Sequence, residues 1–437
     1  MWENHVDLYT EPAVVCNNEV DSWGSTIKMS DEAQSSLDSI WQSEDPIFTN
    51  KELLDIEHIP DEERIIGRDD EISNLANGIH PAIRGGKPRN TIIYGKTGTG
   101  KSLVAKHVTQ SAERFAQKEG THLARAYIDC TQTTTETQVV IKLARSFNDS
   151  EKTDISVPLS GLSTNAYYDR LWNVLDTLHD VVIIILDEID KLQENNVLMQ
   201  LSRAGEAGKL ESCKVGIVAI SNKISFKDSL DERVLSSLQE REFIFPPYDA
   251  NQLREIMRHR EDAFHEGVIS DEVIPLAAAF AAQEHGDARK ALDILRNAGE
   301  LAKDDGSDLV LEEHVRDARE QADIDRFSKL LQDQPTQSKA AVYALSLLAD
   351  GQKQEEFSTR EIYEQYEQLT KTLDIDALSQ RRMADRLNEQ AFLDILGITD
   401  RVGRGRGKGM TNFYYLLEDP EVVQTAIGSD QRFSDVE

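Results

Sequence analysis

Five short, mainly apolar runs mark the chain between residues 91 and 245. They are Thr91–Tyr94, Ala124–Ile128, Val181–Leu186, Val215–Ile220 and Phe243–Phe245. Runs of this kind, separated by segments of helical periodicity, are typical of parallel strands that helices cover on both faces. The pattern therefore predicts an α/β sandwich built around a five-stranded parallel sheet.

After Tyr248 the strand signals stop and helical patterns follow. Four of them, at about 250–265, 271–284, 287–303 and 311–325, predict a small all-helical domain. The turn-forming segment 332–336 marks a boundary. Beyond it, helical patterns at about 338–349, 358–372 and 379–396 precede a glycine-arginine hairpin and the strand-like run Phe413–Leu416. Three helices followed by a β-hairpin describe a winged helix.

The first 46 residues differ from the rest of the chain. They combine Asn, Asp, Glu and Ser with scattered tryptophans and show no sustained period, so we expect a mostly disordered acidic extension. Three domains are predicted after it: an α/β domain over 47–247, a helical domain over 248–332 and a winged-helix domain over 333–437.

The 437-residue chain is strongly acidic. It has 79 Asp and Glu residues against 48 Lys and Arg, a formal charge of −31 and a pI near 4.7. Such an excess normally argues against nucleic acid as a partner. A carboxylate-rich surface also holds hydrated cations, however, as a protein in near-saturating salt requires. We therefore favour a halophilic cytoplasm over an ordinary acidic protein.

Cysteine and hydropathy patterns add little chemistry. Cys16, Cys130 and Cys213 are widely spaced and lack the paired spacing of a metal site, which is typical of a reduced compartment. No apolar stretch approaches the ~20 residues of a membrane span, and we find no secretory signal. The sequence therefore predicts a cytoplasmic protein without a membrane partner.

A glycine-rich loop lies between the first apolar run and a helical pattern. It consists of Gly95, Lys96, Thr97, Gly98, Thr99, Gly100, Lys101 and Ser102. The glycines let successive N–H groups converge on an anion, while Lys101 reaches the β- and γ-phosphates and the Ser102 hydroxyl can ligate Mg²⁺. Few chance matches to this pattern lie between a strand and a helix. The loop therefore predicts binding of ATP or ADP with Mg²⁺ rather than a plain glycine turn.

The run Val181–Leu186 ends in two carboxylates, Asp187 and Glu188. Asp187 is placed to hold Mg²⁺, usually through water, opposite Ser102, and Glu188 to orient and deprotonate an attacking water. Buried strands often end in solvated charges, so the pair alone is weak evidence for a catalytic site. Together with the upstream loop, it favours a nucleotide hydrolase over a simple phosphate binder.

Three further polar residues are candidates for nucleotide contacts. Asn222 follows the run Val215–Ile220, where it is either a hydrogen-bond donor to the γ-phosphate or lytic water, or a turn residue. Arg233 is a candidate for reaching a nucleotide held by a neighbouring molecule. Arg289 begins a predicted helix and is a candidate for the γ-phosphate. Arginine suits both tasks because its charge is permanent and its fork rigid, although each alone is more often a surface ion pair.

Taken in this order, the motifs resemble those of an AAA+ ATPase of the initiator clade. More narrowly, Ile92–Lys101, Gly286–Asp293 and Gly403–Gly409 resemble the archaeal origin recognition and cell division control initiators, with a likeness from about Ile47 to Leu417. The resemblance implies a P-loop AAA+ core with a five-stranded parallel sheet, a helical lid and a C-terminal winged-helix domain.

The same resemblance assigns roles to residues of this sequence. Lys101 and Ser102 bind phosphate and Mg²⁺, and Asp187 and Glu188 serve hydrolysis. The remaining assignments are Asn222 as the first sensor, Arg289 as the second, Arg233 as an arginine finger acting on a neighbouring protomer, and Tyr248 among the nucleotide-binding residues.

Cations in the C-terminal domain run against the acidic trend of the chain. Gln380, Arg381 and Arg382 begin the third predicted helix of the winged helix, where a recognition helix presents side chains to a major groove. Arg404, Arg406 and Lys408 alternate with glycine in the hairpin, which suits entry into a narrow groove. The alternative is a flexible, solvated basic loop.

The resemblance also implies an inserted DNA-contacting helix within about Thr131–Ser150. Lys142 and Arg145 are the cations of an amphipathic stretch there. Without the resemblance, this stretch is a helix that packs on the core.

The function implied by the resemblance is an ATP-dependent initiator that binds double-stranded origin DNA and helps to load the replicative minichromosome maintenance helicase. Slow hydrolysis and self-assembly on DNA belong to the same expectation. The alternative is an orphan paralogue that acts as a nucleotide-switched DNA-binding regulator. A clamp-loader-like ATPase is disfavoured because it leaves the winged helix unexplained. In molar salt, phosphate neutralisation contributes little to affinity, so we expect strong dependence on DNA sequence.

Overall fold

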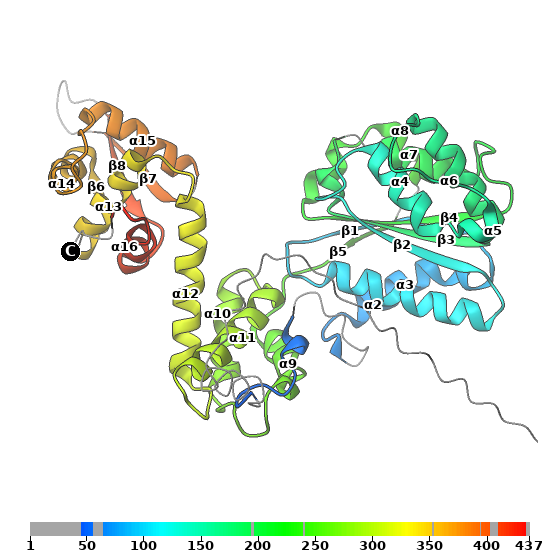
Figure 1. Ribbon diagram of the computed structural model, residues 1–437, viewed down its shortest axis with the longest axis horizontal. Helices are drawn as coiled ribbons and strands as arrows, with labels where there is room; N and C mark the ends of the chain where they lie inside the picture. Colours follow the sequence, from blue (N-terminus) through cyan, green and yellow to red (C-terminus); the bar gives the residue numbers. More distant parts are fainter. Residues whose placement is uncertain are drawn as a thin grey trace, which may run out of the picture. The chain divides into compact units, whose positions relative to one another are not determined.

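The computed structural model describes residues 45–55, 64–193, 196–238, 241–351, 354–393, 395–402 and 410–433 (Figure 1). The predicted N-terminal extension up to residue 44 lies outside this range. So do the hairpin residues Arg404, Arg406 and Lys408.

A five-stranded parallel sheet forms the first domain, as predicted. Its strands are β1 (Thr91–Tyr94), β2 (Leu123–Asp129), β3 (Val181–Asp187), β4 (Lys214–Ser221) and β5 (Arg241–Ile244), in the order β2-β3-β4-β1-β5. The carboxyl ends of β1, β3 and β4 therefore meet at one edge of the sheet. That edge carries the phosphate loop, the candidate carboxylates Asp187 and Glu188, and the candidate amide Asn222.

Helices cover both faces of the sheet, because neighbouring residues of a buried strand point to opposite sides. Ile183 and Ile185 pack toward α2 and α3, whereas Ile184 and Leu186 pack toward the opposite layer. The helices of the first face are α2 (Asp69–Ile79) and α3 (Lys101–Lys118), and those of the second are α4 (Glu136–Phe147), α6 (Thr164–Leu178), α7 (Asn196–Arg203) and α8 (Glu232–Leu238) (Figure 1). Short turns complete the domain: η3 (His80–Arg84), α5 (Ser150–Thr153), η4 (Ile189–Lys191) and η5 (Ile224–Ser229).

Pro246 and Pro247 end the last strand, because proline cannot continue a ladder of backbone hydrogen bonds. The helical lid follows with α9 (Ala250–Arg258), η6 (Glu261–Ala263), α10 (Val273–Gln283), α11 (Ala288–Asp304) and α12 (Glu312–Leu331). Asp249 and Gln252 form a capping box that starts α9.

The lid core also includes a segment from far upstream. Ile47, Phe48 and Leu54, the last of them in η1 (Lys51–Leu54), are buried among lid residues. The Phe48 ring centroid lies 4.9 Å from that of Phe264. Residues 47–55 thus pack on the lid before the chain enters the α/β domain.

Helix α12 is longer than its sequence pattern predicts. We expected a helix over about 311–325, but α12 continues to Leu331, and Phe327 and Leu331 pack in the core of the winged helix. Charged, exposed positions dilute the apolar period in its middle, which explains the early end of the predicted segment. Val315 and Ala318, by contrast, pack in the lid core. One helix therefore contributes to both domains.

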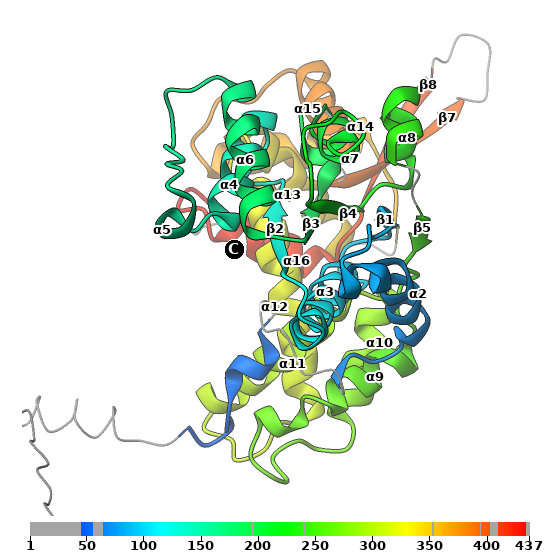
Figure 2. The same ribbon diagram turned by 90° about the vertical axis from the view of Figure 1, so that its right-hand side faces the viewer.

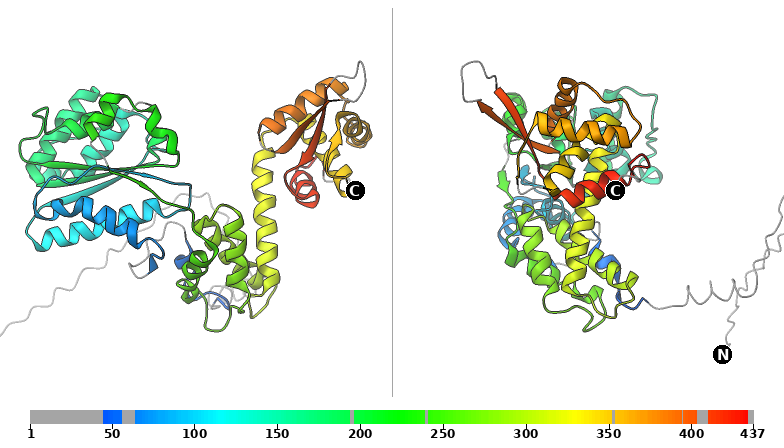
Figure 3. Two further views of the ribbon diagram at one scale, coloured as in Figure 1. Left: turned by 180° about the vertical axis from the view of Figure 1, so that it is seen from behind. Right: turned by 90° about the vertical axis from the view of Figure 1, so that its left-hand side faces the viewer.

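The C-terminal domain is a winged helix, as predicted. It contains α13 (Thr336–Gly351), β6 (Phe357–Ser358), α14 (Thr359–Thr372), α15 (Gln380–Phe392), β7 (Leu396–Val402), β8 (Met410–Leu416) and α16 (Pro420–Gly428). The antiparallel pair β7 and β8 extends past the helices of this domain (Figure 2 and Figure 3).

Three features of this domain differ from the sequence pattern. Helix α15 ends at Phe392 rather than near 396, because Ile395 and Leu396 enter the domain core at the start of β7. Strand β6 pairs with β8, and α16 packs on α13 through Val423 and Ile427. Neither β6 nor α16 was predicted. Among the described residues, no helix combines the length and apolar character that a bilayer span requires.

Candidate nucleotide-binding and DNA-binding sites

The phosphate loop needs glycine at two positions for both backbone and space. Gly98 and Gly100 have φ angles of 73° and 83°, in the left-handed region. A Cβ at Gly98 would lie 1.6 Å from a carboxylate oxygen of Asp287 in the lid, and one at Gly100 would lie 2.5 Å from the Tyr248 hydroxyl. The loop is therefore packed against the start of the lid, and α3 begins directly after it at Lys101.

Lys101 is buried in this loop. Its Nζ donates hydrogen bonds to the carbonyl oxygens of Gly95 and Lys96 at 2.8 and 2.6 Å. Burial lowers the pKa of Lys101 from 10.5 to about 8, while the carboxylates of Asp187 and Glu188 act in the opposite direction. The amino group thus remains mainly charged at neutral pH.

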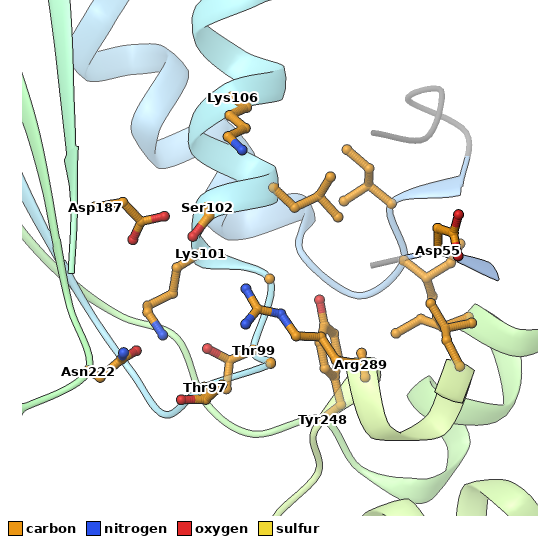
Figure 4. Close-up of a pocket in the computed structure, with 18 of the residues that line it drawn as sticks. Asp55, Thr97, Thr99, Lys101, Ser102, Lys106, Asp187, Asn222, Tyr248 and Arg289 are labelled. Atoms are coloured by element: carbon orange, nitrogen blue, oxygen red, sulfur yellow. The ribbon is translucent and has the colours of Figure 1, made fainter. Parts of the chain in front are cut away.

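Ser102 and Asp187 supply the oxygen donors that suit Mg²⁺. Both line one cavity of about 570 Å³, together with the phosphate loop (Figure 4). In the described ranges, no group of three or more His, Cys, Asp or Glu side chains could hold a metal ion by itself. The residues present fit Mg²⁺ held through nucleotide phosphates, one hydroxyl and one carboxylate.

Tyr127 positions the Asp187 carboxylate. Its hydroxyl donates to Asp187 Oδ2 at 2.7 Å, and the Asp187 Oδ1 atom accepts the backbone N–H of Glu188 at 2.9 Å. The Lys106 Nζ atom lies 3.9 Å from the Tyr127 ring centroid. Burial and the neighbouring carboxylate raise the pKa of Tyr127 far above its ordinary value, so the hydroxyl stays a donor. Sequence reasoning missed Tyr127, because its role requires that β2 lies beside β3.

A buried carboxylate, Asp190, joins the two strand ends that carry Glu188 and Asn222. Asp190 Oδ1 accepts hydrogen bonds from the Ser221 hydroxyl at 3.0 Å and from the backbone N–H of Asn222 at 3.4 Å. Glu188 has a φ angle of 50°, which turns the chain sharply after β3. Glu188 and Asn222 consequently line the same cavity. Asp190 was not singled out from the sequence.

Part of the cavity wall is apolar and combines four segments of the chain. It is lined by Ile65 and Ile66 from the segment before α2, Leu103 from α3, Ile256 from α9 and Leu292 from α11. Such a surface suits the flat face of a nucleotide base. No local motif predicts this apolar surface, because its residues come from four separate segments of the sequence.

Arg289 reaches the cavity from the lid. Asp287 caps α11 by accepting the Arg289 backbone N–H at 2.8 Å, and the Ala288 N–H donates to the Gly98 carbonyl oxygen at 3.2 Å. The side chain points from α11 toward the phosphate loop (Figure 4). Its charge contributes to the lowered pKa of Lys101, in keeping with their proximity. The lid helix therefore brings a second cation to the phosphate end.

Tyr248 and Arg233 differ in their placement. Tyr248 is buried and lines the cavity beside Gly100. Arg233 is exposed on α8, and it is absent from the described residues that line the cavity. A role for Arg233 therefore requires a neighbouring protomer, and it stays a prediction.

The first turn of α15 presents the predicted DNA contacts to solvent. Gln380, Arg381 and Arg382 are exposed, whereas Met383 and Leu387 on the other side of the helix are buried. Within the described part of the chain, neither Arg381 nor Arg382 forms an ion pair. In α4, Lys142 and Arg145 are likewise exposed, while other residues of that helix pack against α6. These four cations are accessible to a polyanion.

Fold and site together define an AAA+ ATPase joined to a winged-helix domain. Three family models match the chain: an AAA domain over residues 84–224, a Cdc6 AAA+ ATPase-type lid domain over 254–320 and a CDC6 C-terminal winged helix domain over 329–426. An ORC1-type DNA replication protein is 53% identical over 93% of this chain, so the chain belongs to the family of ORC1-type DNA replication proteins. The resemblance inferred from its motifs is confirmed.

Two similar relatives come from haloarchaea. ORC1-type DNA replication protein 4 of Halobacterium salinarum is 53% identical, over 93% of this chain and 98% of the relative. ORC1-type DNA replication protein 9 of Haloarcula marismortui is 47% identical, over 86% and 90%. These relatives agree with the halophilic origin expected from the acidic composition.

A solved structure of the Aeropyrum pernix ORC1 protein in complex with DNA is also similar. It is 36% identical and superposes with a TM-score of 0.66, covering 90% of this chain and 99% of that protein. This similarity covers all three domains described above.

Proposed function

We propose that this protein is an ATP-dependent initiator of DNA replication, which binds origin DNA and helps to load the replicative minichromosome maintenance helicase. The observation that carries the proposal is the combination, in one chain, of a nucleotide cavity reached by a lid arginine and a winged helix with exposed cations. The similar structure of the Aeropyrum pernix ORC1 protein, which contains DNA, also supports the proposed binding of DNA. The protein then acts on the chromosome, in the cytoplasm.

In this proposal the loop Gly95–Ser102 binds the phosphates of ATP or ADP, with Lys101 at the β- and γ-phosphates. Ser102 and Asp187 hold Mg²⁺, which when bound neutralises phosphate charge. Glu188 orients and deprotonates the attacking water, and Asn222 hydrogen-bonds the γ-phosphate or that water. Tyr127 and Asp190 keep the carboxylate and amide groups in place.

Hydrolysis is expected to be slow in the isolated protein. Arg289 reaches the γ-phosphate from the lid, so ATP and ADP favour different positions of the lid. Arg233 is exposed and away from its own cavity, so it acts only when a second protomer brings it to the nucleotide. Self-assembly on DNA would supply that protomer.

DNA binding is assigned to two parts of the winged helix. Gln380, Arg381 and Arg382 enter the major groove, and the hairpin cations Arg404, Arg406 and Lys408 contact a neighbouring groove. In molar salt, counterion release contributes little, so base edges and groove shape determine affinity. Origin-like and random duplexes should therefore differ strongly in affinity in molar KCl.

A second candidate is an orphan paralogue that regulates DNA sites without loading a helicase. Haloarcula marismortui has several ORC1-type proteins among the relatives, which favours keeping this candidate. The carboxylate of Glu188 favours the initiator, because a simple nucleotide switch does not need a catalytic base.

Chromosome mapping in the native organism separates the two candidates. Chromatin immunoprecipitation of the protein should give a small number of sites, and depletion of the protein should remove the helicase from those sites. Replacement by a Lys101→Ala protein should reproduce the depletion, with a Lys87→Ala protein as the matched control. Sites that keep the helicase after depletion would instead identify the regulator.

A further inference from the structure

Arg68 is a fully buried arginine directly behind the phosphate loop. Its side chain is 1% exposed, and it lies at the end of the segment that carries Ile65 and Ile66 into the cavity wall. A buried guanidinium is costly unless its charge and its donors are satisfied. The carboxylate of Glu71 lies 3.4 Å from Nη1, so it forms only a long ion pair. Most of the compensation comes from neutral groups.

Those neutral groups belong to the phosphate loop and to the connection between the sheet and the lid. Arg68 Nε donates to the carbonyl oxygen of Thr99 at 3.0 Å, and Nη2 donates to that of Pro246 at 2.6 Å. The guanidinium carbon also lies 3.9 Å from the ring centroid of Tyr248. Thr99 belongs to the phosphate loop, whereas Pro246 and Tyr248 form the connection from β5 to the lid.

The guanidinium lies close to Gly100 of the phosphate loop. A Cβ built on Gly100, the residue before α3, would be 3.8 Å from Arg68 Nε and 2.5 Å from the Tyr248 hydroxyl. The rigid fork points its donors in several fixed directions at once, which a lysine ammonium on a flexible stem does not do. Arg68 therefore holds the phosphate loop, the connection to the lid and the Tyr248 ring in one arrangement.

We propose that Arg68 is a positioning residue, whose guanidinium locks the start of the lid to the phosphate loop so that Arg289 is aligned with the γ-phosphate. This inference rests on the proposed ATP site and goes beyond it, because it assigns the coupling between loop and lid to one side chain. Without the fork, the Thr99 carbonyl lacks its buried donor and the Pro246 connection is free to shift. Arg289 then loses its alignment although its own helix is intact.

A double-mutant cycle on nucleotide preference tests the proposal. ATP and ADP affinities are measured by calorimetry for the full chain, Arg68→Lys, Arg289→Ala and the double variant. In the wild-type background, Arg289→Ala should lower the preference for ATP over ADP about tenfold, as expected for a charge-assisted hydrogen bond. In the Arg68→Lys background, the same substitution should change the preference by less than about twofold. Equal effects in both backgrounds would overturn the proposal.

Control variants separate coupling from stability. Arg84 is an exposed arginine of the same domain, paired with Glu119, and Arg84→Lys should leave the Arg289 effect unchanged. If Arg68→Lys does not fold, as judged by circular dichroism, Tyr248→Leu provides the test, because it removes the ring stacked on the guanidinium. If Arg289→Ala still lowers the preference for ATP over ADP about tenfold in the Tyr248→Leu background, the proposal is contradicted.

The outcome also distinguishes this inference from the function on which it rests. A wild-type chain that binds neither nucleotide would remove the proposed ATP site itself. A wild-type chain that prefers ATP through Arg289, with the preference retained in Arg68→Lys, would remove only the role of Arg68.

Discussion

The nucleotide cavity and the face of α15 that is proposed to contact DNA are built in opposite ways. Cavity residues such as Lys101 and Asp187 are buried and hydrogen-bonded to other groups of the protein. Arg381 and Arg382, by contrast, are exposed and have no ion pair within the described residues. We therefore expect the fold to preorganise phosphate binding, whereas DNA must order the side chains that recognise it, at a cost in side-chain entropy. The two sites should therefore respond differently to substitution.

Glu188→Gln should give the largest effect on the nucleotide side. It removes the carboxylate assigned to water activation while keeping the size of the side chain. We expect ATP hydrolysis, measured as phosphate release, to fall by about 100-fold or more with little change in ATP affinity. Glu206→Gln, at an exposed position, is the matched control. Undiminished hydrolysis would remove Glu188 from the proposed mechanism.

Lys101→Ala tests whether the cavity is separable from the DNA face. It deletes a buried cation at the phosphate position, so ATP affinity measured by calorimetry should fall by about 100-fold. DNA affinity measured without nucleotide should stay close to that of the wild type. Lys87→Ala, an exposed substitution in the same domain, should change neither affinity. A parallel loss of DNA binding in Lys101→Ala would break the comparison.

Replacing Arg381 and Arg382 with alanine should produce the converse result. Loss of two groove-facing cations is expected to weaken binding to an origin duplex by about tenfold or more, measured by fluorescence anisotropy in molar KCl. ATP affinity should be unaffected. Arg386 forms an ion pair with Glu389 on the same helix, so Arg386→Ala is the matched control. If that control weakens DNA binding as much, the contact does not depend on the first turn of α15.

The pH dependence of ATP binding should sharpen the contrast. Since burial lowers the pKa of Lys101 to about 8, binding above that pH must take up a proton, and ATP affinity should fall by up to about tenfold per pH unit. The pH dependence of the folding stability has the opposite sign. Between pH 8 and 10.5 the unfolded lysine binds more protons than the folded one, so the contribution of this group to the free energy of unfolding rises with pH.

Calorimetric titrations at pH 7 and pH 9, in buffers of different ionisation enthalpy, would count the protons taken up. Lys101→Ala should abolish the proton uptake. A proton uptake that persists in that variant would assign the titration to another group.

Tyr127→Phe should have the smallest effect. It removes the hydroxyl that orients Asp187 but keeps the ring beneath Lys106. We expect the Mg²⁺ concentration that supports half-maximal hydrolysis to rise about fivefold, which corresponds to the loss of about 1 kcal/mol from one ordinary hydrogen bond. Tyr168→Phe, which removes a hydroxyl that donates to Glu136 outside the cavity, is the control. An unchanged Mg²⁺ requirement in Tyr127→Phe would show that Asp187 needs no such support.

Contiguous motifs were the part of the site that sequence reasoning predicted well. Residues 97–102 of the predicted loop and the pair Asp187 and Glu188 line the cavity, because residues next to one another in the chain have their geometry set by the local backbone. The winged helix was predicted from its helices and hairpin for the same reason. Strand β6 and helix α16 were missed, since a two-residue strand and a terminal helix carry little periodic signal.

Residues that act across the fold were out of reach of sequence reasoning. Arg68 touches Thr99 and Pro246, which lie 31 and 178 positions away in the chain. Tyr127 meets Asp187 only because β2 and β3 are neighbours in register. Neither residue belongs to a motif. From the sequence alone, Arg68 is read as a surface arginine and Tyr127 as a core aromatic residue.

The amino-acid sequence by itself determined the parallel sheet, the phosphate loop, the helical lid and the winged helix. Each of these depends on local backbone geometry or on the period of apolar residues. Tertiary structure alone decided which side chains support the site: the guanidinium behind the loop, the tyrosine beside the carboxylate and the apolar wall from four segments. Their positions depend on which strands become neighbours and on how the lid packs against the loop. Those contacts join distant parts of the chain, so no local pattern encodes them.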